Sequence, residues 1–255
     1  MNYQALFKTA MLAGEIMAQS GAETYRVEDT MIRILKSAGL SSVEVYATTT
    51  GIVATLSDPA MEPITGVKRI ANRSNNLSRI NDVNQISRNI CDGMISVEEA
   101  CEKLEEIRNS KTYNSLVIAI ATIVSMGGFV GIFGGSLLDC FFAGINGIFI
   151  VIIGKLADNR VSSTFIIDMA KSFVLAVITM IIAKYNNNID RNLIIIGSIM
   201  PLVPGIPITN AIRDTLQGDY NSGTARAVEA FVISLGISVG VGLGIGFFNF
   251  AERIL

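Results

Sequence analysis

One stretch of this 255-residue chain, residues 199–222, is rich in helix-breaking residues. It reads IMPLVPGIPITNAIRDTLQGDYNS, in which Pro201, Pro204 and Pro207 surround Gly205. Each proline removes a backbone donor and clashes with the preceding helical turn, so carbonyl oxygens are left free to bind water or a ligand. One proline would favour a simple kink, but three prolines with a glycine favour an interrupted helix with a binding role.

Polar side chains follow these prolines directly, at Thr209, Asn210, Arg213 and Asp214. An arginine can hold a carboxylate through two parallel N–H···O bonds, so this group could bind an anionic ligand at the mouth of a pathway. The same side chains could instead only anchor the helix end. The sequence favours neither interpretation over the other.

Further charged residues lie within or beside apolar segments. Asp168 and Lys171 have the spacing of a helical ion pair, as do Arg226 and Glu229, and a purely structural pair is the simpler interpretation of each. Charge inside an apolar span is costly and usually faces a cavity or a partner, so Asp168 is a candidate proton carrier. Asp139 is a second candidate, although a hydrated surface carboxylate explains it at least as well.

The composition indicates where these residues are held. Half of the residues are hydrophobic, 16% are charged and the mean hydropathy is +0.49, which is too apolar for an ordinary soluble domain. Residues 1–111 hold 12 Lys and Arg with 14 Asp and Glu, whereas residues 112–255 hold only 8 of each. Neither part has the basic excess that nucleic-acid binding requires, so nucleic acid is excluded as a partner.

The second part predicts membrane-spanning helices, each of about 20 mostly apolar residues. Basic residues are more frequent on the flanks that share a side with the N-terminus, which predicts the N-terminal part inside and the C-terminus outside the cell membrane. An odd number of spans leaves no internal inverted pair, which favours a partner subunit or self-association. Glycines in the last span have four-residue spacings that permit close helix packing. The expected spans are 113–133, 137–156, 163–183, 193–212 and 227–250.

The first part, residues 1–111, predicts a cytoplasmic α+β domain. Ser96 and Glu99 form a capping box before the last of its helices. Lys8 and Glu15 interrupt the first apolar pattern, which argues against a cleaved signal peptide. Apolar periodicity predicts helices over 6–17, 27–38, 77–90 and 97–107, and strands over 43–47, 52–56 and 67–70. The expected fold is therefore an α+β domain followed by an all-α polytopic domain of about five spans at 112–255.

Enzymatic and metal chemistry find little support. The chain has no histidine, and Cys91, Cys101 and Cys140 have no metal-ligand or disulfide spacing, so we expect no metal and no cofactor. An intramembrane hydrolase would need a nucleophile with a base or a metal cluster, which the sequence does not offer. We therefore expect a protein that is not an enzyme.

Three segments together carry a family resemblance: SGAETYRVEDTM at residues 20–31, FGGSLLD at 133–139, and PLVPGIPITNAIRDTLQGDYNSGTARAVEA at 201–230. The chain closely resembles the threonine/serine exporter family over nearly its whole length. The third segment is the most specific. Positions that match the family pattern are Pro201, Pro204, Gly205, Asn210, Arg213, Asp214, Gly218, Asp219, Ser222, Gly223 and Arg226.

The resemblance implies a cytoplasmic domain followed by about five spans, in the split form whose second, smaller membrane subunit supplies the remaining spans. It also implies efflux of threonine and serine driven by the membrane potential or proton gradient, or, for split members, transport of small dicarboxylates such as succinate. The expected partners are a small-molecule substrate, membrane lipid and that second subunit. A different function class stays open: a membrane-anchored regulatory or scaffolding subunit without its own transport path.

Overall fold

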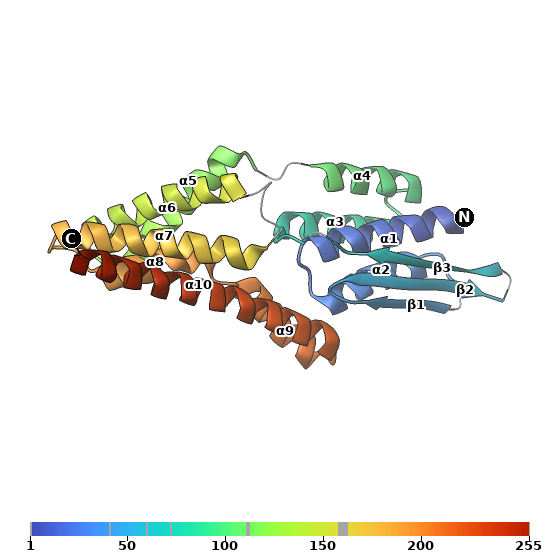
Figure 1. Ribbon diagram of the computed structural model, residues 1–255. Coiled ribbons are helices and arrows are strands. Elements are labelled where there is room, and N and C mark those ends of the chain that lie inside the picture. The colour runs from blue at the N-terminus through green and yellow to red at the C-terminus, as the bar shows by residue number, and fades with distance from the viewer. Residues whose placement is uncertain are drawn as a thin grey trace. The chain divides into compact units, whose positions relative to one another are not determined.

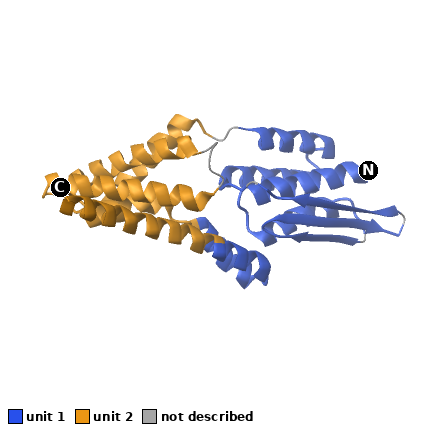
Figure 2. Cartoon of the chain, in the orientation of Figure 1, with its two compact units in different colours: residues 1–112, 206–228 blue, residues 113–205, 229–255 orange. Residues whose placement is uncertain are grey.

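The computed structural model describes residues 2–40, 42–59, 61–71, 73–110, 113–157 and 163–254. The chain forms two compact units: unit 1 takes residues 1–112 and 206–228, and unit 2 takes residues 113–205 and 229–255 (Figure 2). The predicted boundary between Lys111 and Thr112 lies outside the described residues. That residues 206–228 join the first unit was not predicted from the sequence.

Unit 1 combines helices with one antiparallel sheet of strand order β1-β2-β3, the meander that the sequence predicted. Helices α1 and α2 contact the sheet, and α3 and α4 contact α1 (Figure 1). The side chains of Leu6, Met31 and Leu56 are fully buried in the core between them. The elements are α1 (Tyr3–Gln19), α2 (Thr24–Lys36), β1 (Ser42–Ala47), β2 (Gly51–Asp58), β3 (Met61–Arg69), α3 (Leu77–Cys91), α4 (Val97–Asn109), and all but the first residue of α9 (Gly205–Leu216) with the start of α10 (Tyr220–Ile254).

Two local predictions have opposite outcomes in unit 1. Ser96 caps α4 and so confirms one half of the predicted capping box, because its side chain accepts the backbone N–H of Glu99 at 3.1 Å, whereas the Glu99 carboxylate pairs with Lys103 at 2.7 Å. The third strand was predicted to begin after Gly66, which was wrong, because β3 runs through Gly66 from Met61 to Arg69. A side chain at position 66 would place its Cβ 2.8 Å from the Phe7 ring, so the glycine makes room for that ring and marks no turn.

Unit 2 consists of long apolar helices. Among the described residues of the whole chain, four helices are long and apolar enough to cross a membrane, or five if one bent pair counts as a single span. That pair joins residues 191–202 to residues 205–216 with a bend of 56°, as the prolines predicted for the fourth span. The elements of unit 2 are α5 (Ser115–Ile132), α6 (Leu137–Ala157), α7 (Thr164–Tyr185), α8 (Arg191–Ile199), η1 (Met200–Leu202) and the larger part of α10.

Glycines bring α10 close to α7, as their four-residue spacing in the sequence predicted. A Cβ at Gly240 would lie 2.3 Å from the carbonyl oxygen of Met169, and one at Gly244 would lie 2.7 Å from that of Phe173. Gly242 between them has nothing within 4 Å of such an atom. The two helix backbones therefore touch along one face of α10.

Candidate functional site

Two segments far apart in the chain meet inside unit 1. Asp214 of α9 has no exposed surface, and its carboxylate accepts the backbone N–H of Thr24 at 3.0 Å and the Thr24 hydroxyl at 3.2 Å. Thr24 begins α2, where backbone N–H groups lack helical partners and the helix dipole favours negative charge. Asp214 therefore caps α2 from 190 residues away.

Arg226 neutralises this buried carboxylate. Its Nε lies 2.9 Å from Oδ2 of Asp214, although the N–H is not aligned for a hydrogen bond, and its Nη2 donates to the carbonyl oxygen of Ala22 at 2.7 Å. Both side chains are more than nine-tenths buried. A buried charge that loses its partner is strongly destabilising, so the pair must stay together for unit 1 to keep its fold.

Two further contacts fix the same segment. Asn210 donates from Nδ2 to the carbonyl oxygen of Gly21 at 2.8 Å, and Arg213 forms an ion pair with Glu23. Burial raises the pKa of Glu23, but its own backbone N–H together with Arg213 and Arg26 outweighs burial and holds the pKa below its usual value. We call the contacts of Asn210, Arg213, Asp214 and Arg226 with residues 21–24 the clamp.

Asp219 lies in the turn between α9 and α10, and Ser222 and Gly223 lie in the first turn of α10. Ser222 is buried, and a Cβ at Gly223 would lie 2.2 Å from Oγ1 of Thr215, so this glycine lets α10 start against α9. Asp219 lines a small hollow of about 190 Å³ together with Tyr46 of β1. Burial and the charge of Asp214 raise the pKa of Asp219.

Glu28 belongs to the same acidic neighbourhood, although it was not among the predicted site residues. Its carboxylate accepts the backbone N–H of Ala47 at 2.8 Å. Burial raises its pKa despite that bond, and the charges of Asp219 and Asp214 add to the rise. The side chains around Asp214 therefore carry more negative charge than Arg226 alone offsets.

The clamp uses several residues that the sequence had suggested for substrate binding. Asp214 and Arg226 are held by protein groups, which supports the anchoring interpretation of these charges. Arg226 meets Asp214 and the Ala22 carbonyl, partners that its spacing to Glu229 did not suggest. The contributions of Glu23 and Thr24 were missed, because nothing local in the sequence marks them, and only the resemblance at residues 20–31 pointed to this segment.

The prolines are divided between the two units. Pro207 and Thr209 lie in the first turns of α9, where a proline is tolerated because its missing N–H would have no helical partner. Pro204 is buried just before Gly205, which begins α9. Pro201 lies in η1 and lines a cavity of unit 2, which is the relation to a cavity that the helix break suggested.

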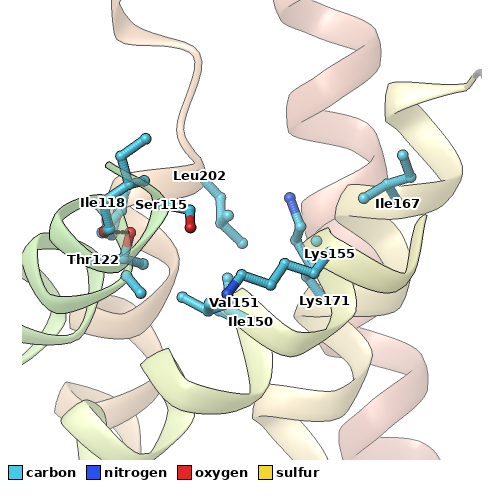
Figure 3. A pocket seen from close by; sticks show the side chains of 12 residues that line it. Ser115, Ile118, Thr122, Ile150, Val151, Lys155, Ile167, Lys171 and Leu202 are labelled. Carbon is cyan, nitrogen blue, oxygen red and sulfur yellow. Dashed lines mark hydrogen bonds between the residues drawn. The ribbon is translucent and has the colours of Figure 1, made fainter. Parts of the chain in front are cut away.

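That cavity has a volume of about 500 Å³. Ser115, Ile118 and Thr122 of α5 line one side, and Lys155 and Lys171 line the other (Figure 3). Ile150, Val151, Gly154, Ile167 and Leu202 are among the apolar residues of its wall. It therefore offers cationic groups on an apolar background.

The predicted pair of Asp168 and Lys171 is confirmed at 3.2 Å, with both side chains largely buried. Asp139 is 3% exposed, so the interpretation as a hydrated surface carboxylate was wrong. It accepts the N–H and the hydroxyl of Ser136 at 2.8 and 2.7 Å and the N–H of Asp190 at 2.9 Å. Asp139 thus closes the first turn of α6 and holds the residue before α8.

Comparison with known proteins identifies the family of the chain. The model of a family described as "Putative threonine/serine exporter" matches residues 8–248. A Mycobacterium tuberculosis protein named "Probable threonine/serine exporter" is 24% identical over 88% of this chain and 42% of its own length. An Escherichia coli protein named "Probable succinate transporter subunit YjjP" is 21% identical over 91% of this chain and 90% of its own length.

A third relative, the "Threonine/serine exporter" of Corynebacterium glutamicum, is 22% identical over 88% of this chain and 47% of its own length. The chain thus spans less than half of the Mycobacterium and Corynebacterium proteins and most of the Escherichia one. No solved structure matches it. The family is one of membrane transporters and not of enzymes, and its match agrees with the several apolar helices of a multi-pass membrane protein. Because the family model covers most of the sequence, the chain belongs to the threonine/serine exporter family.

Proposed function

We propose that the chain is one subunit of a secondary exporter of small polar metabolites, with unit 1 in the cytoplasm and the substrate path through unit 2. The observation that carries the proposal is the cavity beside Pro201, because a helix broken at membrane depth is tolerated where it is buried in protein or lines a hydrated space. The chain orientation expected from basic flanks puts this cavity on the cytoplasmic side.

The lysines of the cavity suit substrates that carry a carboxylate. Lys155 and Lys171 both line it, and Asp168 pairs with Lys171. The named relatives are threonine/serine exporters and a succinate transporter subunit, and every one of those substrates has at least one carboxylate. We therefore infer threonine and serine, or small dicarboxylates such as succinate, as the substrate class.

Export of these solutes against a gradient needs an energy source, and we infer the proton-motive force. A carboxylate paired with a lysine beside the cavity can take up a proton when the lysine turns to an anionic substrate, so Asp168 is the candidate relay. Asp139 is less suited, because three hydrogen bonds to Ser136 and Asp190 hold its charged form. Asp168→Asn should leave export of a substrate unresponsive to a protonophore.

A second membrane subunit completes the proposal. The Escherichia relative is named a transporter subunit, and that name, with the split form that the family resemblance implies, supports a second, smaller membrane protein as the partner. Large apolar side chains such as Leu116, Val117 and Val124 of α5 are exposed and would contact that subunit, another copy of the chain or lipid.

Charge removal at the cavity tests the proposal. The experiment uses a strain that depends on this chain and its second subunit for export of serine, threonine or succinate. Lys155→Gln and Lys171→Gln should each lower export of the transported solute by roughly tenfold or more, which corresponds to the loss of a charge-assisted hydrogen bond. Lys184→Gln is the matched control, because Lys184 pairs with Glu252 at 3.3 Å elsewhere in unit 2. Normal export by both cavity variants would remove the cavity from the path.

A regulatory or scaffolding subunit is the rival, and the clamp favours it, because so many residues of the matching segments hold unit 1 together. Vesicles that contain the chain with its second subunit distinguish the two functions. Flux of an amino acid or a dicarboxylate supports the exporter, whereas vesicles without any such flux support the rival.

A further inference from the structure

Two hollows lie toward opposite ends of the same helices of unit 2. The cavity described above is lined by Lys155 late in α6, Lys171 early in α7 and Pro201 after α8. A second, more open hollow of about 690 Å³ is lined by Asp139 early in α6 and Ala183 late in α7, with the residues that begin α8. At 1.5 Å per residue, roughly 16 Å of α6 separates Asp139 from Ile150 of the first cavity.

A trio of neutral polar side chains occupies the interval between the hollows. Asn146 of α6 donates from Nδ2 to the hydroxyl oxygens of Thr179 of α7 at 2.9 Å and Ser198 of α8 at 3.1 Å. None of the three residues has any exposed surface. On each helix the trio member lies between the residues that line one hollow and those that line the other.

One half of the Asn146 amide lacks a partner. Within the described residues, its Oδ1 is buried and accepts no hydrogen bond. Exchanging the oxygen and nitrogen positions of the amide would let Oδ1 accept from the two hydroxyls and would leave the NH₂ group without a partner. An unpaired buried polar group costs about 1–3 kcal/mol, so the site is built for a further group whichever way the amide is turned.

The chemistry of that group follows from the two orientations. A carboxylate only accepts hydrogen bonds and an ammonium only donates them, so each suits only one of the two amide orientations. The trio also has no charge that would offset the charge of a carboxylate or an ammonium. A hydroxyl both donates and accepts and is neutral. We propose that Asn146, with Thr179 and Ser198, forms a binding site for the hydroxyl group of the transported solute on its way between the two hollows.

This proposal rests on the proposed export function. It predicts that the exporter prefers hydroxylated solutes to the same solutes without the hydroxyl group. Threonine against valine, and malate against succinate, are two pairs in which one member lacks the hydroxyl. Removing the group that pairs with a buried polar site leaves that site unsatisfied, which is the strongest form of such discrimination. The lysines of the first cavity would hold the carboxylate common to all four.

The test is the thermal unfolding of the chain purified with its second subunit, with each of the four solutes present. We expect the hydroxylated member of the pair that binds to raise the unfolding temperature more than its partner does. Asn146→Leu should remove this difference and lower export of the hydroxylated solute about tenfold. The control Ser125→Ala should keep the difference, because the Ser125 hydroxyl bonds to the Thr122 carbonyl of its own helix.

Thr179→Val is a second variant for the case that Asn146→Leu does not fold. It removes one of the two hydroxyls that hold the Asn146 amide, so it should also reduce the difference in unfolding temperature between the paired solutes. Two results would overturn the proposed site: equal shifts in unfolding temperature for both members of each solute pair, or an unchanged difference between them in either variant. The group beside the amide would then be water or nothing. Vesicles without flux would sink the export proposal alone, since the unfolding measurement still reports whether the trio binds a hydroxyl.

Discussion

Asp214 in unit 1 and Asn146 in unit 2 are both without exposed surface, yet their hydrogen bonding differs. Asp214 carries a charge and has three partners, namely the N–H and hydroxyl of Thr24 and the guanidinium of Arg226. Asn146 is neutral and has partners for only half of its amide. Because satisfied polar groups rigidify a fold and unsatisfied ones need another partner, the charged residue anchors and the neutral one is free to bind.

The largest expected effect tests the anchoring half of this comparison. Asp214→Asn removes the charge that offsets buried Arg226, and breaking such a pair from one side costs about 3–5 kcal/mol. We expect that loss in the stability of unit 1, measured by hydrogen exchange at the first turn of α2. Asp29→Asn is the control, because Asp29 and Arg33 form an exposed pair at 2.8 Å, worth at most about 1 kcal/mol.

A double substitution sharpens the same point. Asp214→Leu together with Arg226→Met removes both charges, so it should recover much of the stability that the single change loses. Equal losses from Asp214→Asn and Asp29→Asn would mean that the clamp does not hold α2. The charges of residues 213–226 would then be available for substrate after all.

The second effect concerns the backbone contact between α7 and α10 in unit 2. Gly240→Ala places a Cβ 2.3 Å from the Met169 carbonyl oxygen and 2.9 Å from Cβ of Ser172, and should lower stability by about 1–3 kcal/mol. Gly242→Ala meets nothing within 4 Å and should not lower it. Thermal unfolding in detergent measures both, and similar unfolding temperatures for the two variants would show that backbone contact between α7 and α10 does not stabilise unit 2.

Much of the fold followed from local patterns in the sequence. Apolar periodicity placed the helices and the meander, and the prolines placed the break before α9. Gly66 misled, because a glycine that admits the Phe7 ring looks the same in sequence as one in a turn. The cap that Asp214 gives α2 could not be predicted, since no periodicity reports a contact across 190 residues.

The candidate site was predictable only where charge or proline marked it. Pro201 and the pair of Asp168 and Lys171 were found, and the structure places Pro201 and Lys171 at one cavity. Asn146 was missed, because a neutral residue in an apolar run resembles a helix filler. Its one signal is a spacing of seven residues from Asp139, which puts both on the same face of α6.

The smallest effect comes from the surplus of negative charge around the clamp. Burial, with the charges of Asp219 and Asp214, raises the pKa of Glu28 above its ordinary 4.5. A raised pKa means that the fold favours the protonated form, so this contribution to stability is full below the ordinary pKa and is lost as the pH rises through the folded value. Glu28 should therefore destabilise unit 1 at neutral pH, despite its bond from Ala47.

Glu28→Gln keeps an oxygen that can accept that N–H and removes the charge, so it should stabilise unit 1 at pH 7 by less than either effect above. The gain should vanish in acid below the ordinary pKa of 4.5, where Glu28 is protonated both in the folded and in the unfolded chain. Hydrogen exchange of α2 at the two pH values measures it, with exposed Glu44→Gln on β1 as the control. A loss of stability at pH 7 would show that unit 1 needs the charged carboxylate of Glu28, so that the negative charges around the clamp would be balanced and not in excess.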